Sequence, residues 1–227
     1  MNIVPKAATD IAAFLAEVKS LAPTTKPGQR GRLIFALDAT ASRQPTWDSA
    51  CHLQAEMFRE AAAIGGLDVQ LVYYRGAGEC RASRWVSRPE DLTSLMERIM
   101  CVGGHTQIGK VLSHAKREIP VAALVFVGDA MEEGVDDLCH AAGELGRLGV
   151  PAFMFQEGDD PITEQAFREI ARLTRGAYCR FDPGAAHELA ELLRAAAAYA
   201  AGGMRALADL SARRQSGAIK LLEQMRP

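Results

Sequence analysis

The sequence predicts an α/β protein: a three-layer, doubly wound (Rossmann-like) sheet of about six strands. The first observation is an alternation along the chain, in which short apolar runs are followed by longer segments of helical period. The second is the run VAALVFV, apolar at every position, as is typical of a strand covered by helices on both faces. Together they favour a mostly parallel sheet with right-handed crossovers and helices on both faces.

The predicted strands are short, rich in aliphatic, β-branched or aromatic residues, and bounded by turn residues. The third is more polar and follows the hairpin-like stretch GAGEC, so we expect an antiparallel strand at the sheet edge. The six predicted strands are residues 33–37, 68–74, 82–87, 121–127, 150–155 and 177–181.

The segments between the strands carry apolar residues at helical spacing. In the first of them, Trp47, Met57 and Phe58 share one face, and Pro45 suits the first turn. The predicted helices are residues 45–64, 89–100, 107–118, 134–148, 163–174 and 186–200.

Three parts are expected along the 227 residues, a length that suits one well-packed domain. Residues 1–30 predict an amphipathic helix and a hydrophilic linker, and residues 31–201 the α/β domain. Residues 202–227 predict one more amphipathic helix, over 203–226, that packs on the domain.

Composition argues against several classes of partner. A net charge of -2 gives no basic bias toward nucleic acid or an anionic membrane. No apolar stretch is long enough to predict a membrane span, and the N-terminal stretch lacks the order of a signal peptide. The five cysteines are scattered without a C-x-x-C pair, so we expect neither disulfides nor a zinc site, and a cytoplasmic location.

The stretch GGHTQIGK (103–110) nearly matches a phosphate-binding loop. Val111 stands where that motif needs a hydroxyl, and the stretch follows a predicted helix rather than a strand. The match is therefore interpreted as coincidence. The two glycines instead turn the chain sharply and deliver Thr106 to the next loop.

Oxygen-bearing side chains gather where two predicted strands end. Asp38, Thr40 and Ser42 follow the first strand, Asp129 follows the fourth, and Thr106 opens a helix between them. If the strand order is 3-2-1-4-5-6, the first and fourth strands are neighbours, and the two aspartates face each other at the switch point, where doubly wound sheets bind ligands.

These residue types suit a hard divalent cation. Alternate residues of an extended loop point the same way, so Asp38, Thr40 and Ser42 present three oxygens together. Mg²⁺ prefers oxygen ligands, and two carboxylates in one crevice repel each other without a cation. The sequence therefore predicts a Mg²⁺ (or Mn²⁺) site made by Asp38, Thr40, Ser42, Thr106 and Asp129.

This order of residues resembles the metal-ion-dependent adhesion site (MIDAS) of von Willebrand factor A (VWA) domains, over residues from about 31 to 200. The stretches DATASRQPTWD, VYYRG, GGHTQIG and VFVGDAMEE together resemble stand-alone bacterial VWA proteins with no assigned activity. The resemblance implies that the hydroxyls bind the ion directly and the aspartates largely through water. It also implies that an acidic residue of a protein partner completes the shell.

The chain departs from the usual MIDAS pattern at three places. Thr40 replaces the commoner Ser, Ala41 the usual Gly, and Asp129 lies in GDAMEE rather than T-D-G. The threonine hydroxyl can still coordinate, so we expect the metal to be retained. Four residues are expected at the rim, where they could contact a partner or act only as loop and first-turn side chains: Arg43, His105, Glu132 and Glu133.

The predicted function is metal-dependent protein–protein interaction, in assembly or regulation of a larger complex, without a small-molecule substrate. A metal-dependent hydrolase with Glu132 or Glu133 as general base is one alternative, and a structural module with an empty site is another. Enzyme motifs are absent: a haloacid-dehalogenase-type phosphatase would carry an aspartate where the chain has Thr40, and there is no G-x-S-x-G elbow.

Overall fold

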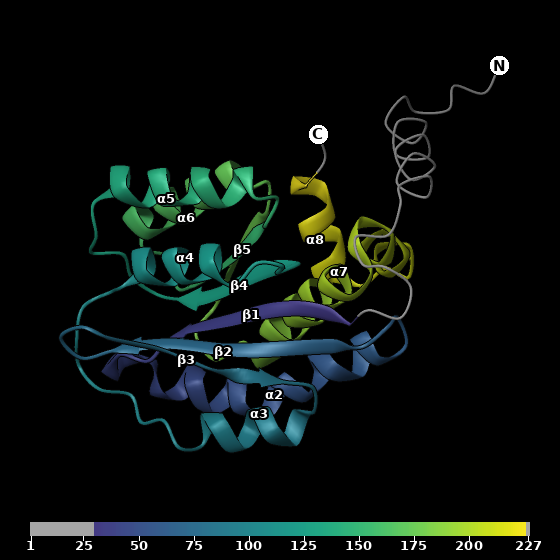
Figure 1. Cartoon of the computed structure of the whole chain (residues 1–227), viewed down its shortest axis with the longest axis horizontal. Helices are drawn as coiled ribbons and strands as arrows, with labels where there is room; N and C mark the ends of the chain where they lie inside the picture. Colours follow the sequence, from purple (N-terminus) through teal and green to yellow (C-terminus); the bar gives the residue numbers. More distant parts are fainter. Residues whose placement is uncertain (1–29, 226–227) are drawn as a thin grey trace.

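The sheet has the order β3-β2-β1-β4-β5-β6 in the computed structural model, which describes residues 30–225 (Figure 1). All neighbours pair in parallel except β2 and β3, which are antiparallel. The predicted fold class is therefore confirmed, and the strand order is the one in which β1 and β4 are neighbours. The strands are β1 (Gly31–Asp38), β2 (Leu67–Arg75), β3 (Glu79–Val86), β4 (Ala123–Gly128), β5 (Ala152–Glu157) and β6 (Ala177–Phe181).

The helices follow the strands as predicted, with shifted ends. They are the 3-10 helix η1 (Ala41–Arg43), α2 (Gln44–Ala62), α3 (Pro89–Met96), α4 (Ile108–Arg117), α5 (Val135–Arg147), α6 (Pro161–Thr174), α7 (Ala186–Ala212) and α8 (Ser216–Gln224). The helix and linker predicted for residues 1–30 lie, except for Arg30, outside the described residues. None of the helices described is long and apolar enough to cross a membrane.

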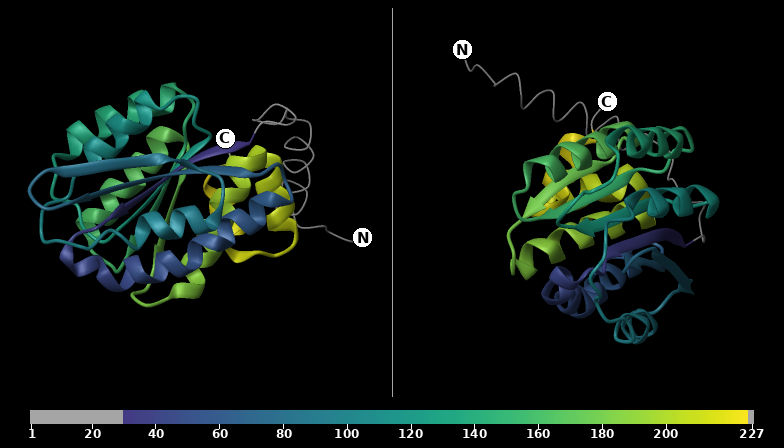
Figure 2. Two further views of the ribbon diagram at one scale, coloured as in Figure 1. Left: turned by 60° about the horizontal axis from the view of Figure 1, so that its bottom comes forward. Right: turned by 90° about the vertical axis from the view of Figure 1, so that its left-hand side faces the viewer.

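Helices cover both faces of the sheet (Figures 1 and 2). One apolar cluster joins the sheet to α2, α3, α7 and α8, and the other joins it to α4, α5 and α6. Strand β1 contributes side chains to both clusters: Leu33 and Phe35 lie in the first, and Ile34 and Ala36 lie in the second. This two-sided burial is the reason why the central strands are continuous apolar runs.

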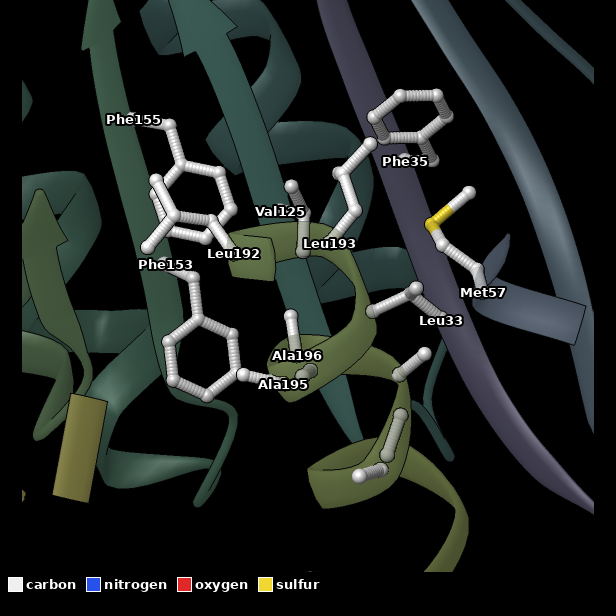
Figure 3. Close-up of a cluster of buried hydrophobic side chains, with 14 of the residues drawn as sticks. Leu33, Phe35, Met57, Val125, Phe153, Phe155, Leu192, Leu193, Ala195 and Ala196 are labelled. Atoms are coloured by element: carbon white, nitrogen blue, oxygen red, sulfur yellow. The ribbon is translucent and has the colours of Figure 1, made fainter. Parts of the chain in front are cut away.

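Helix α7 packs closely on the sheet because its contact face is made of small residues. Figure 3 shows Leu192, Leu193, Ala195 and Ala196 of α7 beside side chains of β1, β4 and β5. At the start of β1, a Cβ on Gly31 would lie 2.2 Å from the backbone oxygen of Ala200. The alanine run thus sets the distance between helix and sheet.

The C-terminal part differs from the single helix predicted over 203–226. Helix α7 continues to Ala212 across a kink at Gly203, whose φ is 66°, and α8 follows after a turn at residues 213–215. Positive φ is favourable for glycine, so a kink at this position costs little strain. Helix α8 packs on α7, where Gly217 lets the backbones approach: a Cβ there would lie 2.2 Å from the Glu191 oxygen.

Candidate metal centre

One cavity of about 260 Å³ lies where β1 and β4 end, and all five predicted metal ligands line it. The two strands are direct neighbours, with Leu37 opposite Val127. The chain therefore leaves both strands at one edge of the sheet. The lining residues are Asp38, Thr40, Ala41, Ser42, Gly103, Gly104, Thr106, Asp129, Ala130 and Glu132.

The Asp38 carboxylate is the most buried charge of this cavity, with only 2% of the residue exposed. Its Oδ1 accepts a hydrogen bond of 2.7 Å from the Thr40 backbone N–H, whereas its Oδ2 has no hydrogen-bond partner in the protein. Burial raises the pKa of Asp38 above its usual value, against the opposing hydrogen bonds from Thr40. A buried carboxylate oxygen without a partner is costly, and a cation would satisfy it.

Ser42 and Asp129 meet on the other side of the cavity. The Ser42 hydroxyl donates to Asp129 Oδ2 at 3.2 Å. The same carboxylate oxygen lies 3.5 Å from Nη1 of Arg43. Asp129 is therefore held by a hydroxyl and a cation of the protein itself.

Thr106 is held by a reciprocal pair of hydrogen bonds with Glu132. Its Oγ1 accepts from the Glu132 backbone N–H at 2.9 Å, and its own N–H donates to Glu132 Oε2 at 3.0 Å. His105 places Nδ1 at 3.3 Å from the same carboxylate oxygen, and its side chain is 83% exposed. His105 and Glu132 thus lie at the mouth, and Glu132 orients the Thr106 hydroxyl.

The loop that carries Thr106 is held against the hairpin between β2 and β3. The Val102 N–H donates to the Ala39 carbonyl at 3.0 Å, and the Gly76 N–H donates to the Val102 carbonyl at 3.4 Å. A Cβ on Gly104 would lie 2.2 Å from the Gly76 oxygen. Only glycine permits this approach, which explains the second glycine of the stretch GGHTQIGK.

The sequence matches no protein-family model and no curated protein. Among solved structures, the fold is similar to a von Willebrand factor type A protein from Catenulispora acidiphila, with a TM-score of 0.59 and 18% identity over 76% of this chain. The VWA domain of SpRpn10 has a TM-score of 0.59 and 10% identity over 72% of this chain and 95% of its own. The chain has the von Willebrand factor A fold.

A third similar structure is proximal thread matrix protein 1 from the mussel byssus, solved with a zinc-occupied MIDAS motif. Its TM-score is 0.57 at 15% identity, over 78% of this chain and 47% of that protein. The chain likewise spans 43% of the Catenulispora protein. At these identities the likeness establishes the fold alone.

Arg43 does not lie on the rim of the cavity, where the sequence placed it. It is only 3% exposed and forms a very short ion pair with Glu157, which also accepts from the Thr46 hydroxyl. Arg43 ends η1, and the ion pair with Glu157 holds its side chain under the loop toward β5. Nε and Nη2 of this guanidinium have no hydrogen-bond partner in the protein.

Glu157 is the functional-site neighbour that the sequence analysis missed. It is the last residue of β5, the strand next to β4, and it is 8% exposed. The rule that located the two aspartates, namely to inspect the carboxyl ends of adjacent strands, would have found it too.

Glu133 is bound to the start of α4 rather than presented at the rim. Its two oxygens accept from the backbone N–H groups of Ile108 at 2.5 Å and Gly109 at 2.9 Å. The carboxylate thus occupies the helix N-terminus that a phosphate would use. This supports the interpretation of the phosphate-loop match as coincidence.

The donor set of the cavity is all oxygen. Within residues 30–225 there is no group of three or more His, Cys, Asp or Glu side chains that could hold a metal. The cavity instead combines the carboxylates of Asp38 and Asp129 with the hydroxyls of Thr40, Ser42 and Thr106. Such hard donors fit Mg²⁺ or Mn²⁺ better than a metal that prefers thiolate or imidazole.

Proposed function

We propose that the chain is a protein–protein interaction module that binds Mg²⁺ (or Mn²⁺) and, through the ion, an acidic residue of a partner protein. The ion would be held by Asp38, Thr40, Ser42, Thr106 and Asp129. The observation that carries this proposal is the buried Oδ2 of Asp38, which has no partner in a cavity lined by all five residues. We further propose that this interaction serves assembly or regulation of a larger complex.

The bound ion would supply a positive charge that a partner carboxylate can coordinate. The protein's own residues have separate tasks: Asp38 and Asp129 provide negative potential, and the hydroxyls provide neutral oxygens. Glu132 holds the Thr106 hydroxyl in place through the reciprocal hydrogen bonds. The zinc-occupied MIDAS motif of the mussel protein, whose fold is similar, supports metal binding by this fold.

Calorimetry with Mg²⁺ and Mn²⁺ tests the metal site directly. We expect saturable binding by the wild-type protein and none by Asp38→Asn, which removes the charge but keeps the shape. The matched control is Asp209→Asn, an exposed aspartate of α7 outside the cavity. If the wild-type protein binds neither ion, the metal site is refuted and the structural module with an empty site is favoured.

A pull-down from lysate in Mg²⁺ and in EDTA, with wild-type and Asp38→Asn protein, tests the partner. We expect partners that are captured by the wild-type protein only in Mg²⁺. Partners that bind equally in all four samples would contradict a metal-bridged interaction even if the ion binds.

A hydrolase is less well supported than a binding module. Both oxygens of Glu133 accept helix N–H groups, and Glu132 is engaged by Thr106 and His105. Neither carboxylate is therefore free to accept a proton from a metal-bound water without losing these contacts.

We also propose a cytoplasmic location. All five cysteines of the chain, at positions 51, 80, 101, 139 and 179, are free thiols. Burial raises the pKa of the Cys51, Cys101 and Cys179 thiols to about 11, so these three resist oxidation through the thiolate.

A further inference from the structure

A second cavity, of about 290 Å³, lies between α4 and the hairpin of β2 and β3. It shares no lining residue with the candidate metal centre. Its volume is at the lower end of the roughly 300–1,000 Å³ of small-molecule pockets. It is lined by Val72, Cys80, Arg81, Ala82, Gly109, Lys110, Ser113, His114 and Arg117.

The lining is strongly basic. Arg81, Lys110 and Arg117 contribute three cations, and Ser113 and His114 add polar groups, whereas no carboxylate lines the cavity. The whole chain carries a net charge of -2, so this concentration of positive charge is local. We name this cavity the basic pocket.

Lys110 is held in place on one wall. Its Nζ donates to the Gly78 carbonyl at 2.9 Å and to Gln107 Oε1 at 2.8 Å. Both acceptors are neutral, so these contacts do not pair the ammonium group with a carboxylate. The fixed Lys110 side chain therefore enters an interaction with an anion at little conformational cost.

The two arginines differ in what they already bind. Arg81 Nε lies 2.8 Å from Glu79 Oε1, which leaves the rest of its guanidinium for a ligand. The Arg117 guanidinium makes no ion pair or hydrogen bond with any residue that the structure describes. Arginine presents a planar fork that matches phosphate oxygens, so these two side chains favour a phosphate group over a simple halide.

Each carboxylate around the basic pocket also contacts a group outside the pocket lining or the backbone of α4. Glu79 pairs with Arg75 as well as with Arg81, and Glu118 accepts from the Trp85 indole at 3.2 Å and lies 4.0 Å from His114. Glu133 caps α4. The pocket's positive charge is therefore only partly neutralised by the protein.

The His114 ring is fixed by Gln70. Gln70 donates through Nε2 to the Ser83 carbonyl, so its Oε1 accepts from His114 Nε2 at 2.8 Å. The ring is thus oriented without a charge partner within hydrogen-bond distance. It completes a wall of defined shape beside Ser113.

We propose that the basic pocket binds the phosphate group of a small, soluble phosphate monoester. Lys110 supplies a fixed charge, and Arg81 and Arg117 supply forked donors to the phosphate oxygens. The remaining volume, next to Val72 and Ala82, accommodates the organic group. This site is independent of the candidate metal centre and gives the module a second ligand.

Calorimetry with inorganic phosphate and with glycerol 3-phosphate, in EDTA, tests the proposal. We expect saturable binding of both, none of glycerol, and a loss of at least about tenfold in affinity in the Arg81→Gln/Arg117→Gln double variant. The control is Arg84→Gln, an exposed arginine of the same strand that does not line the pocket. Absent binding, or an equal loss in the control, would overturn the site.

Thiol labelling provides a readout at the pocket itself. Cys80 lines the pocket, whereas Cys139 on α5 does not. We expect glycerol 3-phosphate to slow alkylation of Cys80, mapped by mass spectrometry, and to leave Cys139 unchanged, also in Asp38→Asn protein. Unchanged labelling of Cys80 at saturating ligand would contradict the proposal. Association with phosphatidic acid vesicles but not with glycerol 3-phosphate would overturn a small soluble ligand.

Discussion

The Arg43 guanidinium and the Glu157 carboxylate form a buried ion pair beneath the loop that carries Thr40 and Ser42. Arg43 also lies 3.5 Å from Asp129. One arginine thus connects the end of β5 with a candidate metal ligand. Burying two charges costs desolvation energy that is recovered only while both partners are present.

Removing one partner of this pair should cost more than removing both. We expect Arg43→Met and Glu157→Met each to lower the free energy of unfolding by about 3–5 kcal/mol, because each leaves the other charge buried and unpaired. The double variant should be less destabilised than either single variant, because it leaves no charge of the pair unpaired. Urea unfolding of the four proteins measures this coupling, and strictly additive losses would contradict it.

Asp160 stabilises the start of α6 by a side-chain cap. Its Oδ2 accepts from the Thr163 N–H at 2.7 Å and from the Thr163 hydroxyl, and these hydrogen bonds lower the pKa of Asp160. We expect Asp160→Ala to lower the free energy of unfolding by about 1 kcal/mol at neutral pH.

The pH dependence of that cost follows from the sign of the pKa shift. A carboxyl whose pKa is lower in the folded state stabilises above its unfolded pKa of about 3.9 and loses this contribution as pH falls through the folded value. Urea unfolding of wild type and Asp160→Ala should therefore converge below about pH 4. A constant difference from pH 7 to pH 3 would rule out the charged cap.

The site is assembled from strand ends and one loop, so its geometry depends on how these elements meet. Strands β1 and β4 place the two aspartates at one edge. The loop before α4 brings Thr106 to the same cavity because Gly104 packs on Gly76. The predicted helix over 89–100 ends at Met96 in the structure, and the freed residues provide this loop.

Two neighbouring glycines provide a matched test of the loop. In Gly104→Ala the new Cβ would lie 2.2 Å from the Gly76 backbone, whereas in Gly103→Ala it would meet nothing within 4 Å. We expect Gly104→Ala to weaken Mn²⁺ binding by about tenfold or more through displacement of Thr106. Gly103→Ala should bind normally. Calorimetry compares them, and equal affinities would show that the loop position does not matter.

Binding of the ion should stabilise the folded state of the whole domain. A ligand that binds only the folded state stabilises it, by about 2.7 kcal/mol at a hundredfold excess over Kd. We expect Mg²⁺ to raise the Tm of the wild-type protein and of Asp209→Asn but not of Asp38→Asn.

In EDTA, where no ion is bound, Asp38→Asn should have a higher Tm than the wild-type protein. The substitution removes a buried charge whose Oδ2 has no partner in the protein. Thermal unfolding in Mg²⁺ and EDTA measures both effects. A destabilised Asp38→Asn in EDTA would show that the carboxylate is needed for folding rather than for a ligand.

Much of this fold follows from local patterns. Apolar runs such as β1 and β4, and helical spacing such as that of α2, involve residues only a few positions apart. The alternation of strands and helices can therefore be predicted from the sequence. The chirality and shortness of the connections then limit the possible strand orders to a few. For the same reason, the five oxygen-bearing residues could be assigned to one cavity.

Tertiary packing decided the rest. Whether Arg43 lies on the rim or beneath it depends on Glu157, which is 114 residues away along the chain. The basic pocket likewise combines β3 with α4. The C-terminal part bends at Gly203 within α7 and divides into two helices only at residues 213–215. The burial and the charge pairing of a side chain depend on residues that are distant in the sequence. A local pattern therefore identifies which residues can act, and only the folded chain determines which of them meet.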